Sequence, residues 1–165
     1  MLGGIMDVTI EEITIDPKIV GRANGLDVVT VQTYADHMKN GAIFPPVEIV
    51  SNGDTLWLVD GQHRLKAAEE LNLEKIEANV THGDRRDALL MSFGTNEEHG
   101  DRRTNEDKRQ KVMAMLEDEE WGKWSNREIS RHCKVSNPFV MKLRNHTAKK
   151  LNAPLYITKQ ASQPQ

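Results

Sequence analysis

Residues 55–71, T-L-W-L-V-D-G-Q-H-R-L-K-A-A-E-E-L, decide how the rest of the chain is organised. The apolar run Leu56–Val59 predicts a short strand, and apolar residues at helical spacing predict a helix after it. The apolar face of that helix carries Leu65, Ala68 and Leu71. Gly61 at the bend lets the backbone approach a ligand closely, and the N–H groups of the first helical turn favour an anion there. Because Arg64 adds a permanent cation with a bidentate fork, the stretch predicts a phosphate site.

The string Asp60-Gly61-Gln62-His63-Arg64 also has plainer explanations, since a tight turn before a solvated helix would read the same way. His63 could donate to an anion or fill the seam between sheet and helix. Asp60 could hold Arg64 in place, receive a proton from an acceptor hydroxyl or cap the helix. The position of the string, after an apolar strand and at a helix start, favours phosphate binding.

Charge is distributed unevenly along the 165 residues. Residues 1–120 carry 24 acidic and 13 basic side chains, a net charge of −11, whereas residues 121–150 carry eight basic side chains and one acidic, a net charge of +7. A basic segment on an acidic body is typical of a nucleic-acid-binding module joined to another domain, although a solvated basic helix face is the alternative. No apolar run approaches the roughly 20 residues that span a bilayer, no signal-peptide pattern opens the chain, and Cys133 is the single cysteine. We therefore expect a cytoplasmic protein associated with DNA.

The residues before the bend predict small elements of α+β type. Met1–Met6 is expected to be a disordered start and Val8–Ile15 to form one strand. Thr30 is expected to cap a helix that ends at Asn40-Gly41. The segment 51–54, Ser-Asn-Gly-Asp, separates two apolar runs, and Asn-Gly in that position predicts a hairpin with a type I′ turn.

After the central helix, Glu74–Val80 is expected to form a strand beside the preceding one. Asp84 is expected to start a helix that ends on Gly94. Thr104, with Asp107 three residues later, resembles a capping box and predicts a further helix.

The basic segment predicts two helices joined by a short turn at Lys134-Val135. Trp121–Ser125 is expected to link them to the preceding helix, with Ser125 capping the first and Ser136 the second, which runs to about His146. The apolar residues fall where a helix-turn-helix buries its core: Ile129, Cys133, Val135, Val140 and Leu143. We expect this unit at residues 125–146 of a helical domain over 104–150, with a tail at 151–165.

In a helix-turn-helix the second helix lies in the major groove of DNA. The residues expected at its base edges are Asn137, Met141, Lys142 and Asn145, with Ser136 beside them. Those expected on phosphates are Arg127, Arg144, Lys149 and Lys150. Such turns usually have glycine where Lys134 stands, and a left-handed non-glycine residue costs on the order of 1 kcal/mol. An ordinary helical hairpin is the alternative, and the local charge favours DNA.

These features resemble the ParB family. Residues 8–120 are similar to its amino-terminal nucleotide-binding domain, whose fold is shared with sulfiredoxin and a small ADP-dependent serine kinase. The expected helix-turn-helix follows where that family has its DNA-binding domain. The resemblance implies an α+β ParB/sulfiredoxin-like domain at residues 8–103, with a small mixed sheet and helices, followed by an all-α domain.

Three family motifs can be compared residue by residue. Arg22 matches the Arg of the first box, Gly61-Gln62-His63-Arg64 stands for G-E-R-R in the second, and Asn96 matches the Asn of the third. The resemblance implies that these residues line the triphosphate of CTP and that Asn96 contributes to a Mg²⁺ ion. Arg102 or Arg103 could close on the phosphates or on DNA, or could belong to a surface loop neutralised by its own acidic residues.

The chain departs from the family pattern at three points. The Gln-Pro before the first-box Arg is absent. Gln62 replaces the Glu that the family links to CTP hydrolysis, and Thr95 replaces the third-box carboxylate. In sulfiredoxin the position of Gln62 holds the nucleophilic Cys, so that activity is not expected. The serine kinase carries Asp-Gly-His-His-Arg, which is close to Asp60–Arg64.

Two functions are therefore expected. The first is a homodimeric DNA-binding protein controlled by CTP, acting in plasmid or phage partition or in transcription regulation. The alternative is an enzyme, either a nuclease or a nucleotide-dependent phosphotransferase, targeted to DNA by the helix-turn-helix. A weak CTPase or nuclease activity would have Asp60 and Gln62 as its candidate catalytic residues.

Overall fold

The computed structural model describes residues 3–95 and 103–150. The chain forms two compact units, and the boundary between them lies between Asp107 and Lys108. This boundary falls inside helix α5 (Asn105–Glu117), four residues after the boundary expected from the sequence. None of the helices in the described part of the chain is both long and apolar enough to cross a membrane.

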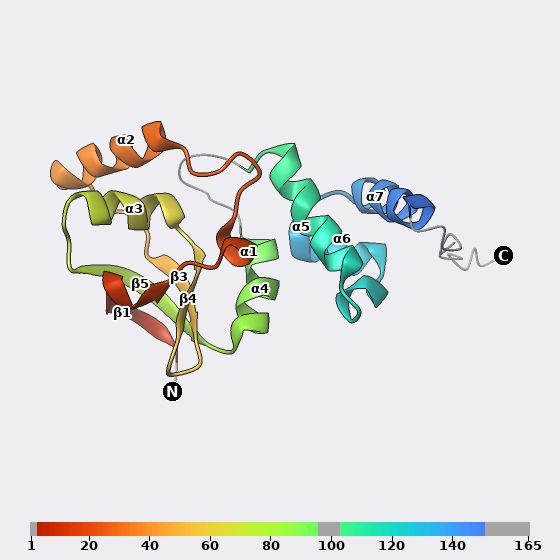
Figure 1. Cartoon of the computed structure of the whole chain (residues 1–165), viewed down its shortest axis with the longest axis horizontal. Coiled ribbons are helices and arrows are strands. Elements are labelled where there is room, and N and C mark those ends of the chain that lie inside the picture. Colours follow the sequence, from red (N-terminus) through yellow and green to blue (C-terminus); the bar gives the residue numbers. More distant parts are fainter. Residues whose placement is uncertain (1–2, 96–102, 151–165) are drawn as a thin grey trace, which may run out of the picture. The chain divides into compact units, whose positions relative to one another are not determined.

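The first unit is built on a five-stranded mixed sheet with the order β1-β5-β3-β4-β2 (Figure 1). Its strands are β1 (Gly4–Thr9), β2 (Ile13–Thr14), β3 (Val47–Ser51), β4 (Leu56–Asp60) and β5 (Lys75–His82). The pairs β1–β5 and β3–β4 are antiparallel, whereas β3–β5 and β2–β4 are parallel. The helices of this unit are α1 (Pro17–Val20), α2 (Val28–Lys39), α3 (Gln62–Glu70) and α4 (Arg85–Gly94). This is the mixed α+β architecture expected from the sequence.

The amino-terminal strand differs from its prediction. Gly4–Met6, expected to be disordered, is part of β1, and the predicted strand Val8–Ile15 is broken by a 3-10 turn, η1 (Ile10–Glu12). The reason is topological, because β1 and β2 lie at opposite edges of the sheet and one straight strand cannot reach both. The buried Ile10 anchors the break, and its N–H donates to the carbonyl of Glu74.

The hairpin β3–β4 and the strand β5 form where they were predicted, but each differs from its prediction in one detail. The hairpin β3–β4 forms as predicted, but its turn is not type I′: Gly53 has a φ of +100°, whereas Asn52 does not have positive φ. Instead the Asn52 side chain accepts from the N–H groups of Asp54 (3.0 Å) and Thr55 (2.8 Å) and so shapes the turn itself. Strand β5 lies between β1 and β3 rather than beside β4, because β2 occupies the other edge of β4.

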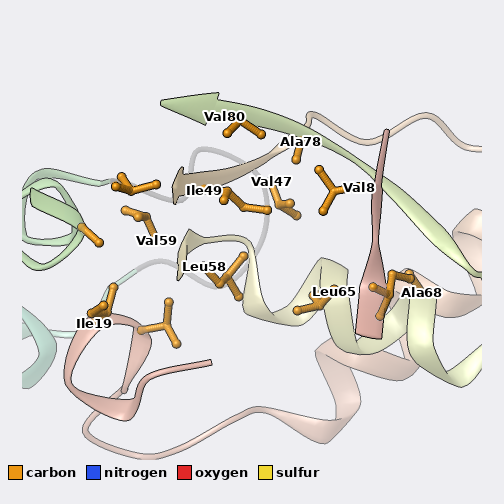
Figure 2. Packing of buried hydrophobic residues seen from close by; sticks show 14 residues of the cluster. Val8, Ile19, Val47, Ile49, Leu58, Val59, Leu65, Ala68, Ala78 and Val80 are labelled. Carbon is orange, nitrogen blue, oxygen red and sulfur yellow. The ribbon is translucent and has the colours of Figure 1, made fainter. Parts of the chain in front are cut away.

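The core of the first unit lies between the sheet and its helices. Val47, Ile49 and Leu58 of the sheet belong to one buried apolar cluster with Leu65 of α3 (Figure 2). A smaller apolar cluster joins α2 to α3 through Val31, Tyr34, Ala35 and Ala67. Burial of apolar surface at roughly 25 cal/mol per Å² fixes α3 against the sheet and so sets the position of the bend before it.

The second unit contains most of α5, a 3-10 turn η2 (Trp121–Lys123) and the helices α6 (Asn126–Cys133) and α7 (Asn137–Lys150) (Figure 1). Trp121, expected in a linker, is 3% exposed and belongs to the core. Within residues 108–150, the buried side chains are Val112, Met115, Trp121, Ile129, Cys133, Val140 and Leu143.

Helix α6 begins as predicted, with a capping box between Ser125 and Glu128. Lys134 follows α6 in the left-handed conformation, with φ +55° and ψ +47°. The turn of a helix-turn-helix usually has glycine at this position. The Oγ of Ser136 accepts from Phe139 N at the start of α7, and α7 continues to Lys150, past its predicted end at His146.

Candidate functional site

The bend between β4 and α3 requires glycine. Gly61 has φ +100° and ψ +28° and is the residue that precedes the first turn of α3. A Cβ built there would lie 2.7 Å from Val47 Cγ1, closer than real contacts allow, and 3.0 Å from Arg64 Nη2, which is a tight contact. Since glycine has no side chain with which to cap the helix, the first-turn N–H groups of α3 receive no such cap.

Arg64 holds this bend from the inside. Its Nη1 donates to the carbonyl oxygens of Pro45 (2.7 Å) and Pro46 (2.8 Å), and its Nη2 lies 3.9 Å from Oδ2 of Asp60. The residue is buried. Arg64 therefore connects the start of α3 to the chain entering β3, and its Nη1 is occupied by backbone carbonyls.

Asp60 and Gln62 flank the bend. Oδ1 of Asp60 accepts from Gly61 N at 2.9 Å, and Oδ2 faces Arg64, so its carboxylate supports the bend geometry. Gln62 is the first residue of α3 and is half-buried.

His63 fills the seam between α3 and α2. The residue is 1% exposed, and its ring makes an edge contact with Tyr34, with centroids 6.5 Å apart. Its Nε2 accepts from the N–H of Asp27 at 3.1 Å, so a neutral ring carries its proton on Nδ1. The contact ties α3 to the loop that precedes α2 and that contains Arg22.

Asp27, rather than the predicted Thr30, caps α2. Its carboxylate accepts from the N–H groups of Val29 and Thr30, each at 3.2 Å, and from the Thr30 hydroxyl. The Thr30 hydroxyl is the main cause that holds the pKa of Asp27 below its usual value. An Asp directly before the apolar pair Val28-Val29 is the local signal that could have found this cap.

Arg22 lies half-buried in the loop between α1 and α2, opposite a buried carboxylate. The N–H of Ala23 donates to Oδ1 of Asp107 at 2.8 Å, and the N–H and hydroxyl of Thr104 both donate to Oδ2 at 2.8 Å. Burial acts to raise the pKa of Asp107, but these hydrogen bonds and the charge of Arg22 outweigh it and hold the pKa below its usual value. Asp107 is thus an ionised carboxylate. Its contact with Ala23, 84 positions away, could not be predicted from neighbouring residues in the sequence.

The third predicted box is only partly within the described residues. Asn96, the candidate Mg²⁺ ligand, and Arg102 lie outside them. Arg103 donates to the carbonyl oxygens of Ser92 (2.8 Å) and Phe93 (3.2 Å) and to the Thr95 hydroxyl. Arg103 therefore caps the carboxyl end of α4, where carbonyl groups lack helical partners. Within residues 3–95 and 103–150, no three His, Cys, Asp or Glu side chains gather as a metal site.

In the second unit, Arg144 also points into the protein. Its Nε donates to Asn126 Oδ1 (2.7 Å), its Nη1 to the carbonyl of Gly122 (2.7 Å) and its Nη2 to that of Trp124 (2.6 Å). Burial lowers the pKa of the Arg144 guanidinium below its usual value, although the group stays charged. Arg144 joins α7 to the start of α6.

The other predicted DNA-binding residues lie on the surface. Those classed as exposed are Arg127, Ser136, Asn137, Met141, Lys142, Asn145, Lys149 and Lys150. Met141, Asn145 and Lys149 are four residues apart, so they share one face of α7. Met141 is 50% exposed, which is unusual for a large apolar side chain in a helical unit of this size.

The chain is similar to several proteins of known structure. The carboxy-terminally truncated chromosome-partitioning protein ParB from Caulobacter crescentus, complexed to the centromeric parS site, has a TM-score of 0.61 and 16% identity over 87% of this chain and 72% of its own. The same protein complexed with CTP-gamma-S gives 0.49 and 17% over 88% and 79%. Sulfiredoxin from Arabidopsis thaliana gives 0.44 and 23% over 52% and 96%.

No curated protein sequence matches the chain. A model of the ParB N-terminal domain matches residues 3–97, which is more than half of the sequence. The match covers every strand of the first unit and the helices α1 to α4. The chain therefore belongs to the ParB N-terminal domain family.

Proposed function

We propose that the chain is a ParB-type DNA-binding protein in which a nucleotide bound by the first unit controls how the second unit engages DNA. The observation that carries the proposal is the bend at Gly61. Its left-handed backbone and the Arg64 contacts with Pro45 and Pro46 present the first turn of α3 in a fixed position. Such a helix start favours the phosphates of a nucleotide.

The nucleotide would lie across the start of α3 and the Arg22 loop. The first-turn N–H groups of α3 and the guanidinium of Arg22 would bind phosphate oxygens, with Gln62 beside them. His63 and Arg64 would act as positioning residues, because the first holds Asp27 and the second holds the two proline carbonyls. Arg103 would position the end of α4, and Asn96 and Arg102 are proposed to complete the site from outside the described residues.

CTP is the proposed nucleotide, on the strength of the family resemblance of the string Gly61–Arg64. A bound Mg²⁺ would be held by the phosphates and by Asn96, and it would neutralise charge on the triphosphate. Gln62 has an amide where the family has a carboxylate, and an amide cannot act as a general base. We therefore propose binding with little or no turnover. Both oxygens of Asp60 support the bend, since Oδ1 accepts from Gly61 N and Oδ2 faces Arg64.

The second unit would bind DNA through α6 and α7 as a helix-turn-helix within residues 125–146. Asn137, Met141, Lys142 and Asn145 are proposed at base edges, and Ser136 caps the same end of α7. Arg127, Lys149 and Lys150 are proposed on phosphates. Arg144 takes a structural role instead, since its guanidinium donates to three acceptors of its own unit.

Coupling between the units would follow from differential binding. A nucleotide that prefers one of two arrangements of the chain shifts the population toward that arrangement, by as much as its affinities for the two differ. We propose a homodimer, with roles in plasmid or phage DNA partition or in transcription regulation. The nucleotide-binding domain would occupy residues 8–103 and the DNA-binding domain residues 104–150.

The proposal is tested by titrating the protein with CTP, ATP and ADP in a calorimeter, with and without Mg²⁺ and duplex DNA. The expected result is saturable binding of CTP, no phosphate release, and a different DNA affinity at saturating CTP. Absence of binding by every nucleotide would contradict the nucleotide site. Phosphate release or DNA nicking that is lost in Asp60→Ala would instead favour the enzymatic alternative.

A further inference from the structure

An open cavity of about 490 Å³ lies between α5 and α7 in the second unit. Its walls are formed by Arg109, Met141, Lys142, Leu143, Asn145, His146 and Lys149. Three of these residues are Arg or Lys and one is His, whereas none carries a carboxylate. Arg109 and His146 are not among the DNA-binding residues predicted from the sequence.

We propose that this groove, referred to here as the α5–α7 groove, binds a sugar–phosphate segment of the DNA backbone, with Arg109 and Lys149 on phosphate oxygens. The inference rests on the proposed DNA-binding function and extends it to a helix outside the two-helix unit. Several cationic side chains on the walls of one groove favour the binding of an anion between them. The planar fork of Arg109 suits two oxygens of one phosphate.

The apolar part of the groove indicates which anion fits. Met141 and Leu143 contribute carbon surface beside the cations, and Met141 is 50% exposed. A deoxyribose ring can cover such surface, whereas a free inorganic phosphate leaves it in water. The combination favours a nucleic-acid strand over a small anion.

The position of the groove on α7 agrees with a continuous DNA strand. Lys142 and Asn145 line the groove and are also among the residues proposed at base edges. Met141, Asn145 and Lys149 are spaced by four residues, with His146 adjoining, so they form one stripe along the helix. A strand that follows this stripe would pass from the base-reading end of α7 to the groove.

The two walls of the groove are held to each other. The Thr147 hydroxyl donates to Met113 Sδ at 3.4 Å between α7 and α5, and Cys133 Sγ lies 3.3 Å from Met115 Sδ between α6 and α5. Met115 and Val112 of α5 are fully buried in this unit. Arg109 is therefore presented from a packed helix rather than from a loop.

The test compares Arg109→Gln with Lys108→Gln in the full chain. Lys108 is the adjacent residue of α5 and has the same burial class, but it does not line the groove, so it is a matched loss of one charge. Binding of a fluorescent mixed-sequence duplex is measured by anisotropy over a range of salt concentrations. We expect Arg109→Gln to weaken binding by about three- to tenfold and to reduce the slope of log K against log salt by about 0.9, the value for one phosphate contact. Lys108→Gln should leave the slope unchanged.

A second variant and two competitors complete the experiment. Lys149→Gln, an exposed substitution near the end of α7, should reduce the slope by a similar amount even if Arg109→Gln alters folding. Equal slopes in wild type and both groove variants would overturn the groove proposal while leaving DNA binding intact. No duplex binding by the wild type would overturn the proposed function and the groove with it.

Inorganic phosphate at constant ionic strength should compete weakly. Polyglutamate is the second competitor. If Arg109→Gln weakened the binding of polyglutamate but not the binding of duplex DNA, the groove would be a site for acidic peptides and the proposal would be overturned.

Discussion

The backbone N–H of Ala23 donates to Oδ1 of Asp107 at 2.8 Å, joining the Arg22 loop to the first turn of α5. The same carboxylate accepts from Thr104, and it is 5% exposed. Asp107 thus serves as an internal anion for a loop that we propose binds phosphates. The contact makes the loop sensitive to the charge of a single side chain.

Asp107→Asn is expected to lower the free energy of unfolding by about 1–3 kcal/mol at neutral pH, because one amide oxygen cannot replace two carboxylate oxygens. The folded pKa of Asp107 lies below its ordinary value of 3.8, so its contribution is present above that value and is lost as the pH falls through the folded pKa. Urea denaturation of both proteins at pH 7 and near pH 3 should show the difference between them shrinking in acid. A difference that is constant with pH would contradict this account of the carboxylate.

A comparison of Gly61→Ala with Gly53→Ala separates the cost of backbone strain from the cost of steric crowding by the added Cβ. Both glycines have φ of +100°, but a Cβ at Gly53 meets nothing within 4 Å, whereas one at Gly61 meets Val47 and Arg64. Strain alone predicts a loss of about 1 kcal/mol for Gly53→Ala, and crowding adds to this in Gly61→Ala. Thermal unfolding gives the stabilities, and CTP titration should show weaker binding in Gly61→Ala only. If both variants lost the same amount of CTP affinity, the result would contradict a nucleotide site at the Gly61 bend.

Arg144→Gln and Lys142→Gln each remove one cation from α7, but the first is expected to affect stability and the second DNA binding. Arg144→Gln leaves carbonyl groups of Gly122 and Trp124 without their donor, so the free energy of unfolding should fall by about 2–4 kcal/mol. Lys142 is exposed, and its replacement should leave stability unchanged while weakening DNA binding. Denaturation and DNA anisotropy on both variants check this assignment. A normal stability for Arg144→Gln would refute the structural role.

Lys134→Gly is expected to stabilise the protein by about 1 kcal/mol, because Lys134 has φ +55° and glycine takes that conformation without steric cost. Asn72, also at φ +55°, is the control. Asparagine tolerates left-handed backbone better than lysine, so Asn72→Gly should give a smaller gain. Melting temperatures of the two variants provide the comparison, and a larger gain at Asn72 would contradict the explanation.

The sequence predicted those features whose causes are local. The caps at Asp84, Ser125 and Ser136 and the hairpin around Gly53 depend on neighbouring residues, and all of them form. The break at Ile10–Glu12 could not be read in this way, because it depends on which edges of the sheet the two flanking strands join.

The arginines illustrate the same limit at the candidate sites. Arg64 and Arg144 were expected to contact phosphate, and for Arg103 phosphate, DNA or a surface loop was left open, yet each of the three donates to backbone carbonyls. A guanidinium fork accepts either partner, and the choice depends on distant chain such as Pro45 and Pro46. Sequence spacing alone therefore does not separate a phosphate ligand from a structural arginine.

The most direct test of the nucleotide site is a titration of ¹⁵N-labelled protein with CTP and Mg²⁺, followed through the backbone amide resonances. The account predicts saturable shifts centred on Gln62 and His63 at the start of α3 and on Ala23 in the Arg22 loop, with little change in α6. Saturable binding that shifts amides elsewhere and leaves those three unchanged would contradict the site at the bend.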